Sequence, residues 1–99
     1  AFMHVKDMEA VAEHVSELMK SLSHKHRLLT LCQLVEGEKA VGELAAALDL
    51  SQPAMSQQLA LLRRDGLVST RREGQTVYYA LPEGEVKKLL RFLYKTYCG

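Results

Sequence analysis

The two cysteines are the most reactive side chains of this sequence, because a thiolate can act as a nucleophile or as a metal ligand. Cys32 and Cys98 lie far apart in the chain and form no Cys-x-x-Cys pair. Two cysteines are few for a small secreted domain, so we expect a cytoplasmic protein with reduced thiols. Considered alone, Cys32 is typical of a small buried hydrophobic residue, and Cys98 of an incidental terminal one.

A second group of side chains has the hydrogen-bonding chemistry that DNA recognition requires. Ser51 is a suitable N-cap for a helix that runs to about Asp65, with Pro53 in its first turn. Its expected inner face holds Met55, Leu59 and Leu62. Its polar outer face holds Gln52, Ser56, Gln57 and Arg63. Glutamine can bond adenine in a bidentate way, and a serine at a helix start suits a phosphate contact.

A basic hairpin follows this helix. Strands are expected over 67–72 and 76–81, joined by the turn Glu73-Gly74-Gln75. The candidate DNA contacts of this hairpin are Arg71, Arg72 and Gln75. A basic hairpin beside a recognition helix is how a wing reaches the DNA backbone or minor groove. The combination is more specific than a polar helix face, which is typical of any solvated helix.

The elements that position these groups are predicted from hydrophobic periodicity. Besides the helix that starts after Ser51, helices are expected over 5–19, 25–35, 41–48 and 83–97. Ser23 is the expected N-cap of the second helix. The predicted fold class is mainly α with a small β-hairpin, one winged helix-turn-helix domain over 1–99. Its helix-turn-helix covers about 41–66 and its wing about 67–81.

Charge and hydropathy are compatible with this fold and exclude a membrane protein. The net charge of +1 does not by itself favour nucleic acid. However, residues 51–99 hold eight Lys or Arg and four Asp or Glu, whereas residues 1–50 hold five and eight. The positive charge therefore lies in the half that contains the predicted DNA-reading elements. No apolar run approaches the roughly 20 residues of a membrane helix.

The stretch 41–81 resembles the core of the ArsR/SmtB family of bacterial repressors. Its landmarks are Leu50, Ser51, Ser56, Leu59, the run Arg-Asp-Gly-Leu-Val at 64–68, the wing Arg-Arg-Glu-Gly and Tyr78-Tyr79. Gln58, where many members have histidine, and Gln75, where a basic residue is frequent, depart from the pattern. The resemblance implies a repressor, not an enzyme, that binds a pseudo-palindromic double-stranded DNA operator. It also implies a homodimer that forms through helices at about 5–20 and 83–98.

Most members of this family release DNA on binding a metal, and metal sites need clustered ligands. The third helix here begins Lys-Ala-Val-Gly-Glu, without Cys or His, and the last helix has no His. The histidines are His4, His14, His24 and His26. We therefore expect no metal or other cofactor, and keep a metal inducer as the alternative.

A cysteine in the second helix with another at the end of the last resembles the persulfide-sensing branch of the family. This resemblance implies that Cys32 and Cys98 react with inorganic or organic persulfides or polysulfides to form a bridge with extra sulfurs, which releases DNA. A plain disulfide needs Cα atoms within roughly 7 Å, whereas a longer sulfur chain spans a wider gap. Charges that could lower a thiol pKa are those of Lys25, Arg27 and Lys95. A plain disulfide formed by general oxidants is a further alternative.

Overall fold

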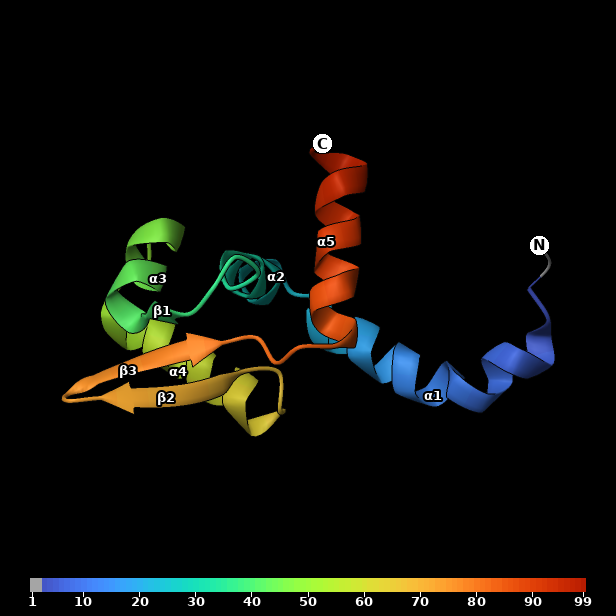
Figure 1. Cartoon of the computed structure of the whole chain (residues 1–99), viewed down its shortest axis with the longest axis horizontal. Helices are drawn as coiled ribbons and strands as arrows, with labels where there is room; N and C mark the ends of the chain where they lie inside the picture. Colours follow the sequence, from blue (N-terminus) through green and yellow to red (C-terminus); the bar gives the residue numbers. More distant parts are fainter. Residues whose placement is uncertain (1–2) are drawn as a thin grey trace.

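The computed structural model describes residues 3–99 and has the predicted winged helix-turn-helix architecture (Figure 1). The elements in chain order are α1 (Val5–Leu22), α2 (Lys25–Gln33), β1 (Lys39–Ala40), α3 (Val41–Leu48), α4 (Gln52–Arg64), β2 (Ser69–Glu73), β3 (Thr76–Ala80) and α5 (Glu85–Tyr97). The predicted fold class is confirmed. The first two residues of the domain predicted over 1–99 lie outside the described residues.

The helix-turn-helix is formed by α3 and α4 around a short left-handed turn. Asp49 adopts φ +56°, a conformation that aspartate tolerates better than most residues, and the Leu50 N–H bonds the Ala45 carbonyl at 2.9 Å. Ser51 then caps α4, because its hydroxyl accepts a hydrogen bond from the Ala54 N–H at 3.2 Å. The turn and the cap together fix the direction in which α4 leaves α3.

Leucine side chains from the three central helices form the core. Met55, Leu59 and Leu62 of α4 are fully buried, as predicted, and pack in one cluster with Leu31 of α2 and Leu44 of α3. Burying a side chain of this size contributes about 1.5–3 kcal/mol relative to leaving it exposed. The inner face of α4 therefore anchors the helix and leaves its opposite face toward solvent.

The sheet has three antiparallel strands in the order β1-β3-β2. β2 and β3 pair from Ser69 opposite Ala80 to Glu73 opposite Thr76. Gly74 closes the hairpin with φ +62°, a conformation that glycine adopts without steric cost. β1, which pairs Lys39 with Tyr79, was not predicted, because two residues are too few to show an alternating pattern.

Several predicted boundaries were wrong. α1 extends to Leu22 rather than ending at 19, because the Leu22 side chain is buried in the core. α2 ends at Gln33, before Val35, because the Leu34 N–H bonds the Leu31 carbonyl in a tighter final turn. Ser23 is not the N-cap of α2: its hydroxyl instead donates to the Lys20 carbonyl at 2.7 Å, at the end of α1.

The other two boundaries are those of β2 and α5. β2 starts at Ser69 rather than 67, since the two preceding side chains enter the core. α5 starts at Glu85 rather than 83, because Gly84 has φ +140°, outside the helical range.

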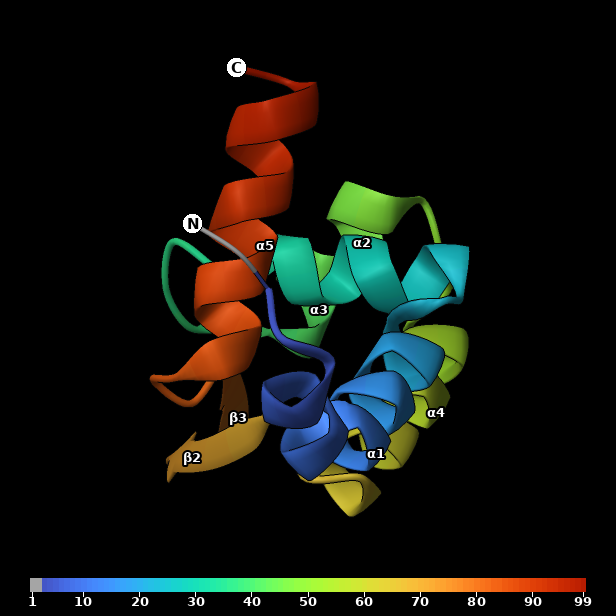
Figure 2. The same cartoon turned by 90° about the vertical axis from the view of Figure 1, so that its right-hand side faces the viewer.

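α1 and α5 carry apolar side chains that this single chain leaves exposed. α1 extends away from the core, and α5 stands beside α2 (Figures 1 and 2). Val5 of α1 is 73% exposed and Tyr97 of α5 is 80% exposed. The His14 imidazole and the Glu85 carboxylate connect the two helices at 2.6 Å. None of the helices within residues 3–99 is long and apolar enough to cross a membrane.

Candidate nucleic-acid interface and thiol pair

The outer face of α4 is the first candidate DNA-reading surface. The predicted polar residues Gln52, Ser56, Gln57 and Arg63 are all exposed, whereas the inner face of the same helix is fully buried. The side-chain amide nitrogen of Gln52 lies close to Gly42 of α3. A Cβ atom placed on Gly42 would be 3.5 Å from this nitrogen. Ser56 and Gln57 are therefore the side chains of this surface freest to reach base edges.

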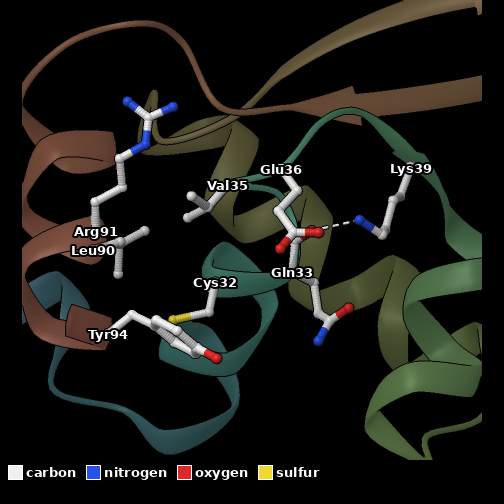
Figure 3. Close-up of a pocket in the computed structure, with 8 residues that line it drawn as sticks. All are labelled: Cys32, Gln33, Val35, Glu36, Lys39, Leu90, Arg91 and Tyr94. Atoms are coloured by element: carbon white, nitrogen blue, oxygen red, sulfur yellow. Dashed lines mark hydrogen bonds between the residues drawn. The ribbon is translucent and has the colours of Figure 1, made fainter. Parts of the chain in front are cut away.

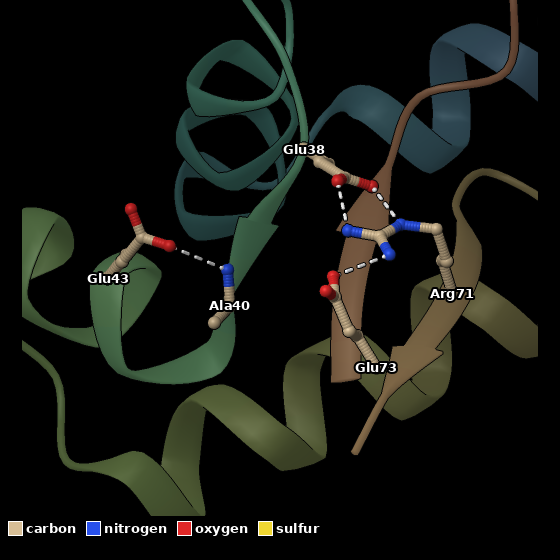
Figure 4. A network of polar contacts seen from close by, with 5 residues as sticks. All are labelled: Glu38, Ala40, Glu43, Arg71 and Glu73. Carbon is tan, nitrogen blue, oxygen red and sulfur yellow. Dashed lines mark hydrogen bonds and ion pairs between the residues drawn. The ribbon is translucent and has the colours of Figure 1, made fainter. Parts of the chain in front are cut away.

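Arg71 of the wing is held by two carboxylates rather than left free (Figure 4). Its guanidinium donates to both oxygens of Glu38, at 2.6 and 3.1 Å, and to Glu73 at 2.9 Å. Its carbon also lies 4.7 Å from the centre of the Tyr78 ring. The hydrogen bonds from Arg71 lower the pKa of Glu38, and the same bonds raise the pKa of Arg71.

This network changes what each arginine of the wing can do. One guanidinium and two carboxylates leave a local charge of −1, which does not attract a phosphate. Arg72 is exposed and follows Arg71 in β2, so it points to the opposite face of the sheet. Sequence reasoning missed Glu38, because it comes from the segment before β1, and only the pairing of β1 with β3 brings it to the wing.

We expect the two neighbouring arginines to differ when each is replaced by alanine. Arg72→Ala should weaken binding to specific and non-specific DNA alike, and reduce the slope of log affinity against log salt by about one. Arg71→Ala should leave that slope unchanged, because its charge is already paired. Titrations of operator and random DNA at several salt concentrations measure both. An equal fall of the slope in both variants would show that Arg71 also binds phosphate.

The two predicted thiols approach each other from different helices. Cys32 lies near the end of α2 and is half-buried, Cys98 follows α5 and is exposed, and both are free. The Cys32 side chain points toward α5, where the Tyr94 ring lies beside it (Figure 3). The Cys98 N–H bonds the Tyr94 carbonyl at 2.8 Å, so the second thiol lies one helical turn further along.

Burial raises the pKa of the Cys32 thiol, and the electrostatic effect of the nearby Cys98 raises it further. The charges of Lys25, Arg27 and Lys95, which could lower the pKa of a thiol, do not offset these two effects at Cys32. Arg27 is instead paired with Asp65 of α4, at 3.7 Å. Cys32 is therefore mainly a thiol near neutral pH, and its thiolate fraction rises as the pH rises toward the raised pKa.

A cavity of about 310 Å³ opens beside Cys32, between the end of α2, the segment before β1, and α5 (Figure 3). It is lined by Cys32, Gln33, Val35, Glu36, Lys39, Leu90, Arg91 and Tyr94. Sequence reasoning missed it, because no periodic pattern connects residues of these three segments. In the part of the chain that the structure describes, no three His, Cys, Asp or Glu side chains are grouped to hold a metal ion.

Comparison with known proteins identifies the family. Residues 24–70 match the model of the bacterial regulatory proteins of the arsR family. The transcriptional activator HlyU of Vibrio cholerae is 47% identical over 97% of this chain and 89% of its own length. The crystal structure of the transcriptional repressor BigR from Xylella fastidiosa covers 98% of this chain and 99% of its own, with 44% identity and a TM-score of 0.89.

A third match bears on assembly. The solution structure of the homodimeric winged helix-turn-helix domain Mb0332 from Mycobacterium bovis covers 89% of this chain and 82% of its own. Its identity is 32% and its TM-score 0.74. The fold and these relatives define a winged helix-turn-helix, DNA-binding regulator of transcription. The chain belongs to the ArsR family of bacterial regulatory proteins, and HlyU and BigR are among its closely similar relatives.

Proposed function

We propose that this protein is a repressor that releases its operator when sulfur bridges Cys32 and Cys98. The observation that carries the proposal is the placement of the two thiols. The Cys32 side chain points from α2 toward α5 (Figure 3), and Cys98 directly follows α5, near enough to contribute to the raised pKa of Cys32. Inorganic or organic persulfides and polysulfides are the proposed inducers. No cofactor is required, because the thiols themselves react.

DNA recognition is assigned to α4 and the wing. Ser56 and Gln57 contact bases in the major groove, which admits one helix. Phosphate and flanking contacts come from Ser51, Gln52, Arg63, Arg72 and Gln75, with Arg71 holding the wing in position. The exposed polar face of α4 and the free charge of Arg72 support this division.

The proposed homodimer is built on α1 and α5. The exposed apolar side chains of these helices are Val5, Met8, Val11, Met19, Phe92, Tyr94 and Tyr97. A surface of this kind is untypical of a monomer. The M. bovis relative, whose solution structure is homodimeric, supports assembly as a dimer. A two-fold dimer presents two copies of α4, so it fits a pseudo-palindromic operator with half-sites about one helical turn apart.

The bridging reaction balances with two molecules of a persulfide, RSSH, and no other oxidant. The Cys32 thiolate attacks the outer sulfur of RSSH, which forms Cys32–S–SH and expels RS⁻. This persulfide, deprotonated, attacks a second RSSH in the same way and becomes Cys32–S–S–SH. The Cys98 thiolate then attacks the middle sulfur and expels HS⁻, which leaves a trisulfide. Two thiols and two RSSH thus give one trisulfide, two RSH and one H₂S.

The bridge is proposed to act through helix positions. α2 packs on α3 of the helix-turn-helix, whereas α5 belongs to the proposed dimer interface. A covalent bridge between α2 and α5 therefore couples the placement of each DNA-reading unit to the dimer. In the bridged dimer, the distance between the two copies of α4 no longer matches the spacing of the operator half-sites. The affinity for DNA then falls by the coupling free energy between bridge formation and DNA binding.

Intact-protein mass spectrometry tests this chemistry. The reduced protein is treated in parallel with inorganic tetrasulfide, hydrogen peroxide and a small organic disulfide, and then digested to locate the bridge. We expect an internal bridge between Cys32 and Cys98 that contains extra sulfur, and only with the sulfur donor. A plain disulfide with every oxidant would identify a general redox switch, and an unmodified protein would return attention to a metal inducer.

A further inference from the structure

The cavity beside Cys32 is larger than an inorganic sulfur donor requires. Its volume of about 310 Å³ lies at the lower end of the range of small-molecule sites, which is about 300–1,000 Å³. The side chain of Cys32 forms part of its wall, so a molecule in the cavity is in contact with the thiol. The cavity is thus suited to a small organic molecule that delivers a sulfur atom.

The charges on the cavity wall favour an anion. Arg91 and Lys39 are positive and Glu36 is negative, which leaves an excess of one positive charge. Lys39 donates one hydrogen bond, to the Gln33 carbonyl at 2.7 Å, so two of its three ammonium donors are available. Arg91 forms no ion pair within residues 3–99, and the effect of its charge on Glu83 is the weakest of the causes that shift that pKa.

We propose that this cavity binds the organic part of an inducer and selects persulfides that carry a carboxylate. The Arg91 guanidinium, assisted by Lys39, pairs with the carboxylate while the outer sulfur meets Cys32. A guanidinium is well suited to this task because its planar fork of donors matches a carboxylate. The proposal rests on the proposed function, since it concerns the donor of the first sulfur transfer.

Binding in the cavity also compensates for the raised pKa of Cys32. Because little thiolate is present near neutral pH, a donor that only collides with Cys32 reacts slowly. A donor held in the cavity keeps its outer sulfur beside the thiol until a thiolate forms. The transfer itself is unchanged: Cys32–S⁻ and R–S–SH give Cys32–S–SH and RS⁻, where R bears the carboxylate.

A matched pair of donors tests the selection. N-acetylcysteine persulfide carries the carboxylate, and the persulfide of its amide differs only in having no charge there. The rate of sulfur addition to the full-length protein is followed by mass spectrometry, and each rate is divided by that of the same donor with a small reference thiol. We expect the carboxylated donor to react about fivefold faster, the ratio that an ion pair of about 1 kcal/mol produces.

Two variants locate the effect. Arg91→Gln should reduce the ratio to about one, because the pairing charge is lost. Lys88→Gln removes the same charge from an exposed position of α5 outside the cavity, and should keep the wild-type ratio. A ratio of one in the wild type, or an unchanged ratio in Arg91→Gln, would overturn the proposed carboxylate site. If both donors still bridged the two cysteines in that case, the proposed function would stand. No bridging by either donor or by inorganic tetrasulfide would overturn the proposed function itself.

Discussion

Replacing Cys98 by serine should abolish the release of DNA by polysulfide and leave the reduced protein's operator affinity within about twofold of wild type. The wild type should lose about a hundredfold in affinity on treatment, a coupling free energy of about 2.8 kcal/mol. Cys98 is exposed and follows the last helix, so its loss removes no core packing. Without it, Cys32 can still accept sulfur, but no bridge can connect α2 to α5. Operator titrations before and after tetrasulfide treatment measure the effect.

Cys32→Ser provides the matched control for this prediction. This variant should also fail to release DNA on treatment with polysulfide. Unlike Cys98→Ser, it should lack the first addition of sulfur at position 32, so the masses of the intact proteins distinguish the two variants. Cys98→Ser should retain one or more sulfurs on Cys32, whereas Cys32→Ser should gain sulfur only at the exposed Cys98. Release of DNA by polysulfide from either single variant would rule out the bridge as the switch. Failure of both reduced variants to bind the operator would mean that the thiols serve folding instead.

The helix-turn-helix was predictable because its signals are local. Ser51 and Pro53 are residue types typical of a helix start, and they predict where α4 begins. Met55, Leu59 and Leu62 repeat at the helical period, which predicts the buried and the exposed face of α4. Boundaries were less predictable where tertiary packing decides them. Nothing in the composition around Leu34 distinguishes a continued helix from the tighter final turn of α2.

The sequence was sufficient to predict the types of residue in the candidate site, but not which residues contact one another there. Arg71 and Arg72 look equivalent as neighbours in a basic strand, yet only Arg71 meets Glu38, which is brought near by the two-residue strand β1. The thiol pair is a similar case. The sequence shows Cys32 and Cys98, but the direction of the pKa shift depends on burial and on the distance between α2 and α5. Such properties arise from long-range contacts, which periodicity does not encode.

Replacing Gln57 by alanine should lower operator affinity by about tenfold and leave affinity for random DNA unchanged. Gln57 is exposed in the second turn of α4, the part of a recognition helix that reaches base edges. A bidentate contact from glutamine to adenine is worth about 1–3 kcal/mol of discrimination, and tenfold corresponds to about 1.4 kcal/mol. Because the side chain is neutral, its removal should not change the salt dependence of binding.

The adjacent Gln58 offers the matched control, since it has the same side chain on the same helix but is half-buried. Gln58→Ala should reduce operator affinity by less than Gln57→Ala, because the Gln58 side chain is less exposed than that of Gln57. The ratio of operator to random-DNA affinity, measured for both variants at one salt concentration, separates base reading from general attraction. An equal loss on both DNAs for Gln57→Ala would contradict its base contact, and would leave Ser56 as the base-reading residue of α4.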